Sequence, residues 1–154
     1  IILRPGQTMH VAPKVGLTPS EQRFFRTAER AGPWQWRGWR LATVLCREVD
    51  DADAIEAAYA GRIDALLWPG YIAWGAGALD AGALARRLSV PILQCNWPEA
   101  RNAPGQHRMG RSQWIRPDGQ VEAVGPDGVG VARWVLSDPL QLTPRPRRPG
   151  TAPG

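Results

Sequence analysis

Three short apolar runs, separated by two alanine-rich segments, limit the folds open to this chain more than any other feature. The expected strands are 39–46, Ile63 to Trp68 and Val90 to Cys95, and the expected helices are Asp51 to Ala60 and Ala76 to Leu88. Strands that are apolar throughout are typical of sheets covered on both faces. Strand, helix, strand, helix, strand at this spacing predicts an α/β fold with a parallel sheet and right-handed crossovers. Pro69 and Gly70 are expected to end the middle strand.

The first of these strands ends on Cys46, and a charged turn leads from it into a helix. Ligands and catalytic groups in open α/β sheets collect at the carboxyl ends of strands. A thiol there can lie close to the N-terminus of the next helix, which favours the thiolate. We therefore predict that Cys46 is a nucleophile, with the backbone N–H of Arg47 available to an oxyanion.

Lys14 stands out because the other eighteen basic residues of the chain are all arginines. A lysine is a compact point charge and an arginine is a planar fork, so Lys14 can mark a site that arginine would not serve. Near Cys46 it would favour the thiolate and stabilise an oxyanion. A solvated surface lysine is the alternative, and the sequence alone leaves both open.

A capping box opens the helix that is expected after Lys14. Thr18 suits the N-cap, and Glu21 lies three residues further on. The helix is expected to run to about Arg30, before the Gly-Pro pair at 32–33. Glu21 is therefore explained as a helix cap, although it can also orient Lys14.

Net charge and cysteine content exclude several classes of protein. The charge of +5 is spread along the chain, and its dense cluster lies in a proline- and arginine-rich tail, 139–154, that is expected to be disordered. No nucleic-acid partner is therefore expected. Two cysteines are too few for a disulfide framework, no apolar run reaches membrane length, and no signal peptide is expected. The expectation is one domain over 1–138, cytoplasmic and without membrane contact.

No zinc spacing, Walker loop or Rossmann glycine pattern is present, so neither a metal nor a cofactor is expected. His10 and His107 are interpreted as ordinary histidines, and Cys95 as a buried strand residue. Three tryptophans are expected to pack within strands: Trp68, Trp114 and Trp134. Trp74 and Trp97 follow strand ends, where substrate pockets form, so we expect them to line a pocket.

Hairpins and loops are expected outside the parallel unit. The hairpins cover Ile1 to Ala12 and Ser112 to Val124, and the second turns at 117–120. A long polar loop is expected over 96–109, and a last strand over Val129 to Leu136.

Five short motifs follow one another along the chain. They are a strand–turn–strand–lysine unit over Ile1 to Leu17, Val44-Leu45-Cys46-Arg47-Glu48, Gly61 to Pro69, Cys95-Asn96, and Gly110-Arg111-Ser112 followed by Pro117-Asp118-Gly119. In this order they resemble the motifs of the carbon–nitrogen hydrolase, or nitrilase, superfamily, and the resemblance runs from Ile1 to about Asp138. Each motif is weak alone, and their order carries the resemblance.

The resemblance implies a Glu–Lys–Cys hydrolase of amides or nitriles that needs no cofactor. Cys46 would attack the substrate carbon to form a thioester or thioimidate, which water then hydrolyses. Lys14 would stabilise the tetrahedral intermediates, and Glu21 is the candidate second glutamate. Glu48 matches the acidic residue of the cysteine motif, for which a structural role is also open. Asn96, which ends a strand, is a candidate to line the substrate pocket together with Trp74 and Trp97.

The family's base glutamate lies upstream of its lysine, and its fold is a larger four-layer α-β-β-α sandwich. The resemblance therefore implies a partial sandwich, and we expect sequence to be missing before Ile1. Without that glutamate the chain alone is expected to hydrolyse little. A non-catalytic relative that serves as a scaffold or binding protein is the alternative. A homo-oligomer is expected, because members of the family commonly pair.

Overall fold

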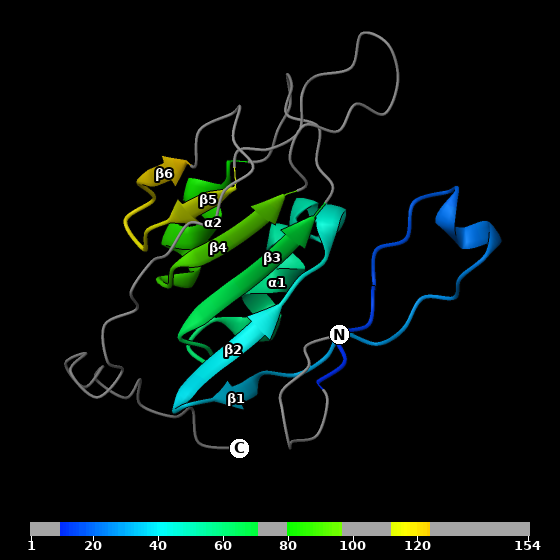
Figure 1. Cartoon of the computed structure of the whole chain (residues 1–154), viewed down its shortest axis with the longest axis horizontal. Coiled ribbons are helices and arrows are strands. Elements are labelled where there is room, and N and C mark those ends of the chain that lie inside the picture. Colours follow the sequence, from blue (N-terminus) through cyan, green and yellow to red (C-terminus); the bar gives the residue numbers. More distant parts are fainter. Residues whose placement is uncertain (1–9, 71–79, 97–111, 124–154) are drawn as a thin grey trace, which may run out of the picture.

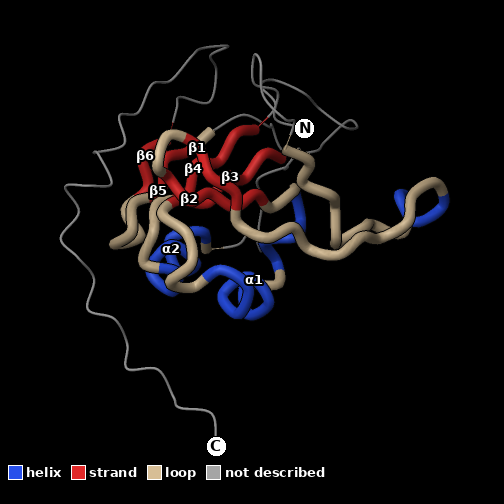
Figure 2. Tube along the Cα trace, turned by 90° about the horizontal axis from the view of Figure 1, so that it is seen from below, coloured by secondary structure: helices blue, strands red, loops and turns tan. Residues whose placement is uncertain are grey.

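The computed structural model describes residues 10–70, 80–96 and 112–123. Within these residues, six strands form one mixed sheet in the order β1-β2-β3-β4-β5-β6. The strands are β1 (Trp34–Trp36), β2 (Trp39–Thr43), β3 (Ala65–Gly70), β4 (Ile92–Asn96), β5 (Gln113–Ile115) and β6 (Val121–Ala123). The helices are α1 (Ala52–Tyr59), α2 (Ala81–Leu88) and the 3-10 turns η1 (Glu21–Arg23) and η2 (Cys46–Asp50). Figure 1 shows the sheet, and Figure 2 shows α1 and α2 together on one of its faces.

Strands β2, β3 and β4 form the parallel centre of this sheet, and the outer strands add to it antiparallel. Leu41 lies opposite Ala65, and Leu66 lies opposite Ile92. The chain passes through α1 between β2 and β3, and through α2 between β3 and β4. The predicted α/β unit is therefore confirmed, and the antiparallel edges make the sheet mixed.

Carboxylates start both helices. Asp51 accepts a hydrogen bond from the backbone N of Ala54 at 3.1 Å, and Asp80 accepts one from Ala83 at 2.9 Å. A capping carboxylate satisfies a backbone N–H that has no partner within the helix, and it also interacts favourably with the dipole. Gly61 follows α1 with a φ of 72°, a conformation that glycine adopts without steric cost. The predicted end of this helix is confirmed.

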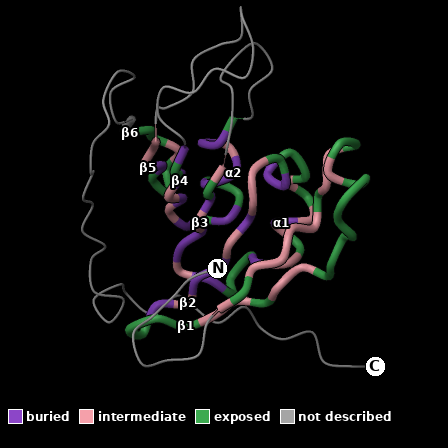
Figure 3. Tube along the Cα trace, turned by 45° about the vertical axis from the view of Figure 1, so that its right-hand side comes forward, coloured by how far each residue is buried: buried purple, intermediate pink, exposed green. Residues whose placement is uncertain are grey.

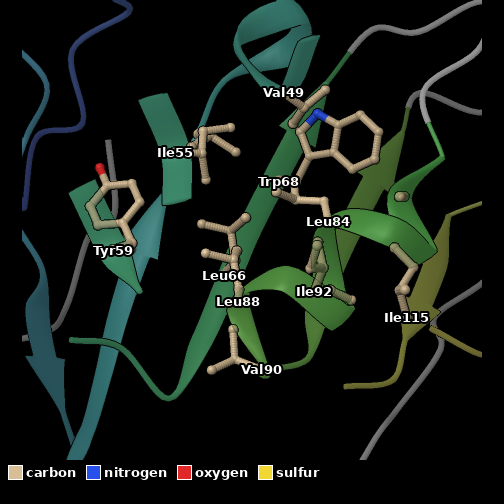
Figure 4. Packing of buried hydrophobic residues seen from close by; sticks show 14 of the residues in the cluster. Val49, Ile55, Tyr59, Leu66, Trp68, Leu84, Leu88, Val90, Ile92 and Ile115 are labelled. Atoms are coloured by element: carbon tan, nitrogen blue, oxygen red, sulfur yellow. The ribbon is translucent and has the colours of Figure 1, made fainter. Parts of the chain in front are cut away.

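The main core lies between the two helices and the sheet. Figure 4 shows side chains of α1, α2, β3 and β4 meeting there, with Trp68 beside Val49 at the end where β3 reaches η2. Trp68 is only 1% exposed, as predicted for a packed strand tryptophan. A second, smaller cluster on the opposite face of the sheet contains Trp39, Leu41 and Ala65. Both faces of the parallel strands thus carry buried apolar side chains, in line with their apolar sequences.

Strand β3 does not end at Pro69 and Gly70 as predicted, because both residues belong to it. Pro69 lies opposite Cys95 of β4, whereas the ladder between β3 and β2 ends at Leu67. A proline lacks the N–H that an interior strand needs, so it is tolerated where its strand has no neighbour on one side. The absence of β2 at this level explains why Pro69 fits.

The interpretation of Cys95 as a buried strand residue is also wrong. Cys95 lies in β4, as predicted, but its side chain is exposed. Successive side chains of a strand point to opposite faces. The buried neighbours are Gln94 and Asn96, which are 2% and 5% exposed.

The helix predicted from Thr18 to Arg30 is reduced to η1, a single 3-10 turn. The capping interactions still form, since Glu21 accepts a hydrogen bond from the Thr18 backbone N at 2.8 Å. Phe24 and Phe25, however, are 81% and 64% exposed, so no apolar face packs against the body of the protein. Short helices are marginal without such packing. We call residues 11–33 the arm, and Figure 3 shows its tip to be exposed.

The hairpin predicted at 112–124 is confirmed by the antiparallel pair β5 and β6, with Gly119 at a φ of 87° in the turn.

Neither α-helix of the described ranges is long and apolar enough to cross a membrane. Other expectations fall on residues outside those ranges. They are the strands within 1–9, the start of the second helix at 76–79, Trp74, Trp97, the part of the predicted loop at 97–109 with His107, the strand at 129–136 with Trp134, and the tail at 139–154.

Gln94 provides a test of the core. Within the described residues its two amide atoms are buried without a hydrogen-bond partner. Leaving such a group unsatisfied costs about 1–3 kcal/mol. We therefore expect Gln94→Met, which keeps the volume and removes the polar atoms, to raise the free energy of unfolding measured by urea titration.

Ile92→Val on the same strand face is the matched control, with an expected loss of about 0.5–1.5 kcal/mol. If Gln94→Met destabilised the protein as much as this control does, the amide would have to be satisfied in solution.

Candidate active site

Cys46 lies just past the carboxyl end of β2, where the backbone changes direction. Leu45 is still extended, with φ −108° and ψ 122°, and Cys46 then adopts a φ of +53° at the start of η2. A non-glycine residue in this left-handed region costs about 1–3 kcal/mol and persists only where its surroundings enforce it. The thiol predicted to be the nucleophile therefore sits on a strained turn, and its residue is half-buried.

Three contacts hold this nucleophile turn, residues 45–48. The indole N–H of Trp68 donates to the carbonyl oxygen of Cys46 at 2.8 Å. The backbone N of Glu48 donates to the carbonyl of Leu45 at 3.1 Å, and the Leu45 backbone N donates to Glu48 Oε2 at 2.9 Å. Because Trp68 is part of the buried core, the turn is anchored to closely packed side chains.

Glu48 also reaches across to the segment that carries Lys14. Its Oε1 accepts hydrogen bonds from the backbone N of Val15 and, at 3.3 Å, from that of Gly16. A Cβ on Gly16 would lie 3.3 Å from Glu48 Cγ, so the two segments are in close contact. The buried carboxylate thus places the lysine loop, residues 14–16, directly against the nucleophile turn.

Arg30 supplies a positive charge to the same carboxylate. Its Nη1 lies 3.8 Å from Glu48 Oε2, and its side chain is only 18% exposed. Tyr59 packs nearby, and its hydroxyl donates to the carbonyl of Ala31 at 2.8 Å. Burial raises the pKa of Tyr59, and the neighbouring Arg30 opposes that rise. The end of the arm is therefore fixed against α1 beside Glu48.

Lys14 and Glu21 form an ion pair, with Nζ 2.5 Å from Oε1. The other oxygen of Glu21 accepts hydrogen bonds from the backbone N and the hydroxyl of Thr18, at 2.8 and 2.9 Å. The hydrogen bond from Lys14 and then that from the Thr18 backbone lower the pKa of Glu21 from 4.5 to about 2. Glu21 makes the reciprocal contacts of a capping box with Thr18, which precedes η1, and it also pairs with Lys14. The two interpretations from the sequence therefore do not exclude each other.

Four predicted site residues thus fall into one connected region: Cys46, Lys14, Glu21 and Glu48. The guanidinium of Arg47 turns outward, with its side chain 72% exposed, and pairs with Asp50 at 2.9 Å. Asn96 is buried at the end of β4, where its backbone N donates to Ser112 Oγ at 3.0 Å. Asn96 therefore lies two strands away from the strand that leads to Cys46, and Trp74 and Trp97 lie outside the described residues.

Two contributors to this region were not predicted. The sequence pattern predicts only a packing role for Trp68, although a tryptophan at the end of a buried strand usually has its N–H paired. The pattern predicts the end of a helix at Arg30, and nothing in the sequence distinguishes this residue from the other arginines. Its role depends on a contact with Glu48, eighteen residues further along the chain.

No protein-family model and no curated protein matches this chain. Solved structures do match it. An amidase from Nesterenkonia sp. AN1 superposes with a TM-score of 0.62 and 24% sequence identity, over 74% of this chain and 46% of the amidase. A cysteine-to-alanine variant of that amidase in complex with butyramide superposes with a TM-score of 0.62 and 23% sequence identity, over 74% of this chain and 45% of the variant. A glutamine-dependent NAD+ synthetase from Acinetobacter baumannii superposes with a TM-score of 0.69 and 16% sequence identity, over 79% of this chain and 25% of the synthetase.

These similarities establish the fold. The amidase is from the nitrilase superfamily, so the expected carbon–nitrogen hydrolase fold is confirmed for this chain. The chain spans less than half of the length of the amidase. In a glutamate-to-glutamine variant of that amidase, the acetamide moiety of fluoroacetamide is covalently added at the active-site cysteine.

The ion pair of Lys14 and Glu21 makes a prediction about pH. Because the pKa of Glu21 is depressed to about 2 in the folded protein, the pair stabilises the fold above 4.5 and is lost as the pH falls from 4.5 toward 2. We expect Glu21→Gln to lower the thermal unfolding midpoint near neutral pH, and this difference from wild type to disappear at the acidic end.

Glu29→Gln is the control, since it removes an exposed carboxylate from the same arm. A difference between Glu21→Gln and wild type that persisted unchanged down to the acidic end would contradict the ion pair.

Proposed function

We propose that this chain performs cysteine-based chemistry on the carbon–nitrogen bond of a small amide or nitrile. The observation that carries the proposal is the bridge made by Glu48, which holds the Lys14 loop against the strained turn of Cys46. An ammonium group beside a thiol favours the thiolate and stabilises negative charge that develops on the substrate. The shared fold of a nitrilase-superfamily amidase supports the same chemistry.

In the proposed reaction the Cys46 sulfur attacks the carbonyl carbon of an amide and the oxygen takes the negative charge. The Lys14 ammonium stabilises this oxyanion, and Glu21 holds Lys14 in place through their ion pair. The carbon–nitrogen bond then breaks, ammonia or an amine leaves with a proton, and the thioester remains. Water hydrolyses the thioester to the carboxylic acid and restores the thiol.

The group that removes the proton from the attacking thiol is not assigned among the described residues. The superfamily resemblance places this base on a glutamate upstream of the lysine. We therefore expect the chain alone to form covalent adducts at Cys46 but to hydrolyse amides poorly. A homo-oligomer and a cytoplasmic location also remain predictions.

Fluoroacetamide tests the proposed nucleophile. Attack by the thiolate displaces fluoride and leaves an acetamide group on sulfur, as seen at the active-site cysteine of the amidase variant. We expect Cys46 to be labelled faster than the exposed Cys95, when both are followed in one sample by peptide mass spectrometry. Lys14→Ala should slow the labelling of Cys46 about tenfold, the scale of losing an opposite charge beside an ionised group.

Arg23→Ala is the matched control, since it removes one positive charge from an exposed position on the same arm. Equal labelling of both thiols, with no effect of Lys14→Ala, would reject the hydrolase proposal and favour a non-catalytic scaffold.

A further inference from the structure

We propose that Glu48 is a positioning residue, which sets the place of Lys14 relative to Cys46 without taking part in proton transfer. The inference rests on the proposed function, because it assigns the group that assembles the two functional side chains. Glu48 follows Cys46 by two residues, and it is the buried group that contacts both the nucleophile turn and the lysine loop.

The two carboxylate oxygens of Glu48 bind different segments of the main chain. Oε2 accepts from the backbone N of Leu45, the residue immediately before Cys46, at 2.9 Å. Oε1 accepts from the backbone N of Val15, the residue immediately after Lys14, and also from Gly16. One rigid, planar group thus fixes the main chain next to each functional residue.

A carboxylate is the side chain that suits this environment. Three backbone N–H groups point at Glu48, which is 4% exposed, and Arg30 lies 3.8 Å from one oxygen. An ionised carboxyl group is acceptor-only, whereas an amide presents one oxygen and two N–H donors. Glutamine in this place would therefore turn an N–H group toward one of the two segments, and that segment would lose its acceptor.

The same contacts argue against Glu48 as the general base. A base must lie within hydrogen-bond reach of the proton that it removes, with a lone pair directed at it. Both oxygens of Glu48 are engaged by main-chain donors on either side, so the carboxylate is committed to holding the chain. Its effect on catalysis must pass through the placement of Lys14, and small displacements of a catalytic group cost rate steeply.

Alkylation by iodoacetamide in the full chain tests this role. The rate at Cys46 is measured relative to Cys95 near pH 7 and near pH 9, for wild type, Lys14→Ala, Glu48→Gln and the double variant. We expect Glu48→Gln to slow Cys46 about as much as Lys14→Ala does near pH 7, and less near pH 9. The double variant should be no slower than either single variant, since groups that act through one another are not additive.

Asp64→Asn is the matched control for a purely structural loss. Asp64 accepts hydrogen bonds from the backbone N and the guanidinium of Arg40, at 2.8 and 2.7 Å, at the opposite end of the parallel strands. This variant should lower the thermal midpoint and leave the ratio of Cys46 to Cys95 labelling unchanged.

The outcomes separate the two proposals. If Lys14→Ala slows Cys46 but folded Glu48→Gln does not, or if the two effects multiply in the double variant, the positioning role is overturned and the proposed function stands. If Lys14→Ala has no effect, the proposed function fails as well.

If Glu48→Gln does not fold, Gly16→Ala takes its place, because the added Cβ would press on Glu48 Cγ from the lysine loop. An unchanged Cys46 rate in folded Gly16→Ala would then overturn the positioning role.

Discussion

One buried carboxylate joins the two halves of the candidate site. Glu48 belongs to the turn after β2, and it binds main-chain N–H groups both in that turn and in the arm. A buried charge is costly unless its partners are in place. The arm contributes these partners together with Arg30. The ion pair of Lys14 and Glu21 therefore lies at the site only while the arm is docked against η2 and α1.

The two halves differ in how they are held. The nucleophile turn rests on the core through Val49 and Trp68, which are almost fully buried. The arm exposes Phe24 and Phe25 and is attached mainly by polar contacts, among them the hydrogen bond from Tyr59 to the main chain. Regions with few buried apolar contacts open first. Opening of the arm would separate the lysine from the thiol while the sheet stays intact.

The features that could be predicted correctly from the sequence are those that depend on local pattern. The parallel unit followed from three apolar runs and two helical segments, and Cys46 was placed at a strand end for the same reason. The helix from Thr18 failed because its capping signal is local, whereas its persistence needs a surface to pack on. Glu48 contacts Val15 from 33 residues away, and no local rule foresees such a contact. The grouping of Lys14, Glu21 and Cys46 was suggested by the chemistry of these residue types, and the family resemblance then supported it.

The backbone at Cys46 has a consequence for how this position can change. A φ of +53° suits glycine or asparagine better than cysteine. Glycine there would relieve about 1–3 kcal/mol of backbone strain, which exceeds the cost of about 0.5–1 kcal/mol for its greater conformational freedom. Substitutions that stabilise are easily found and commonly reduce activity. Backbone strain thus favours glycine at this residue, whereas the proposed chemistry needs the cysteine.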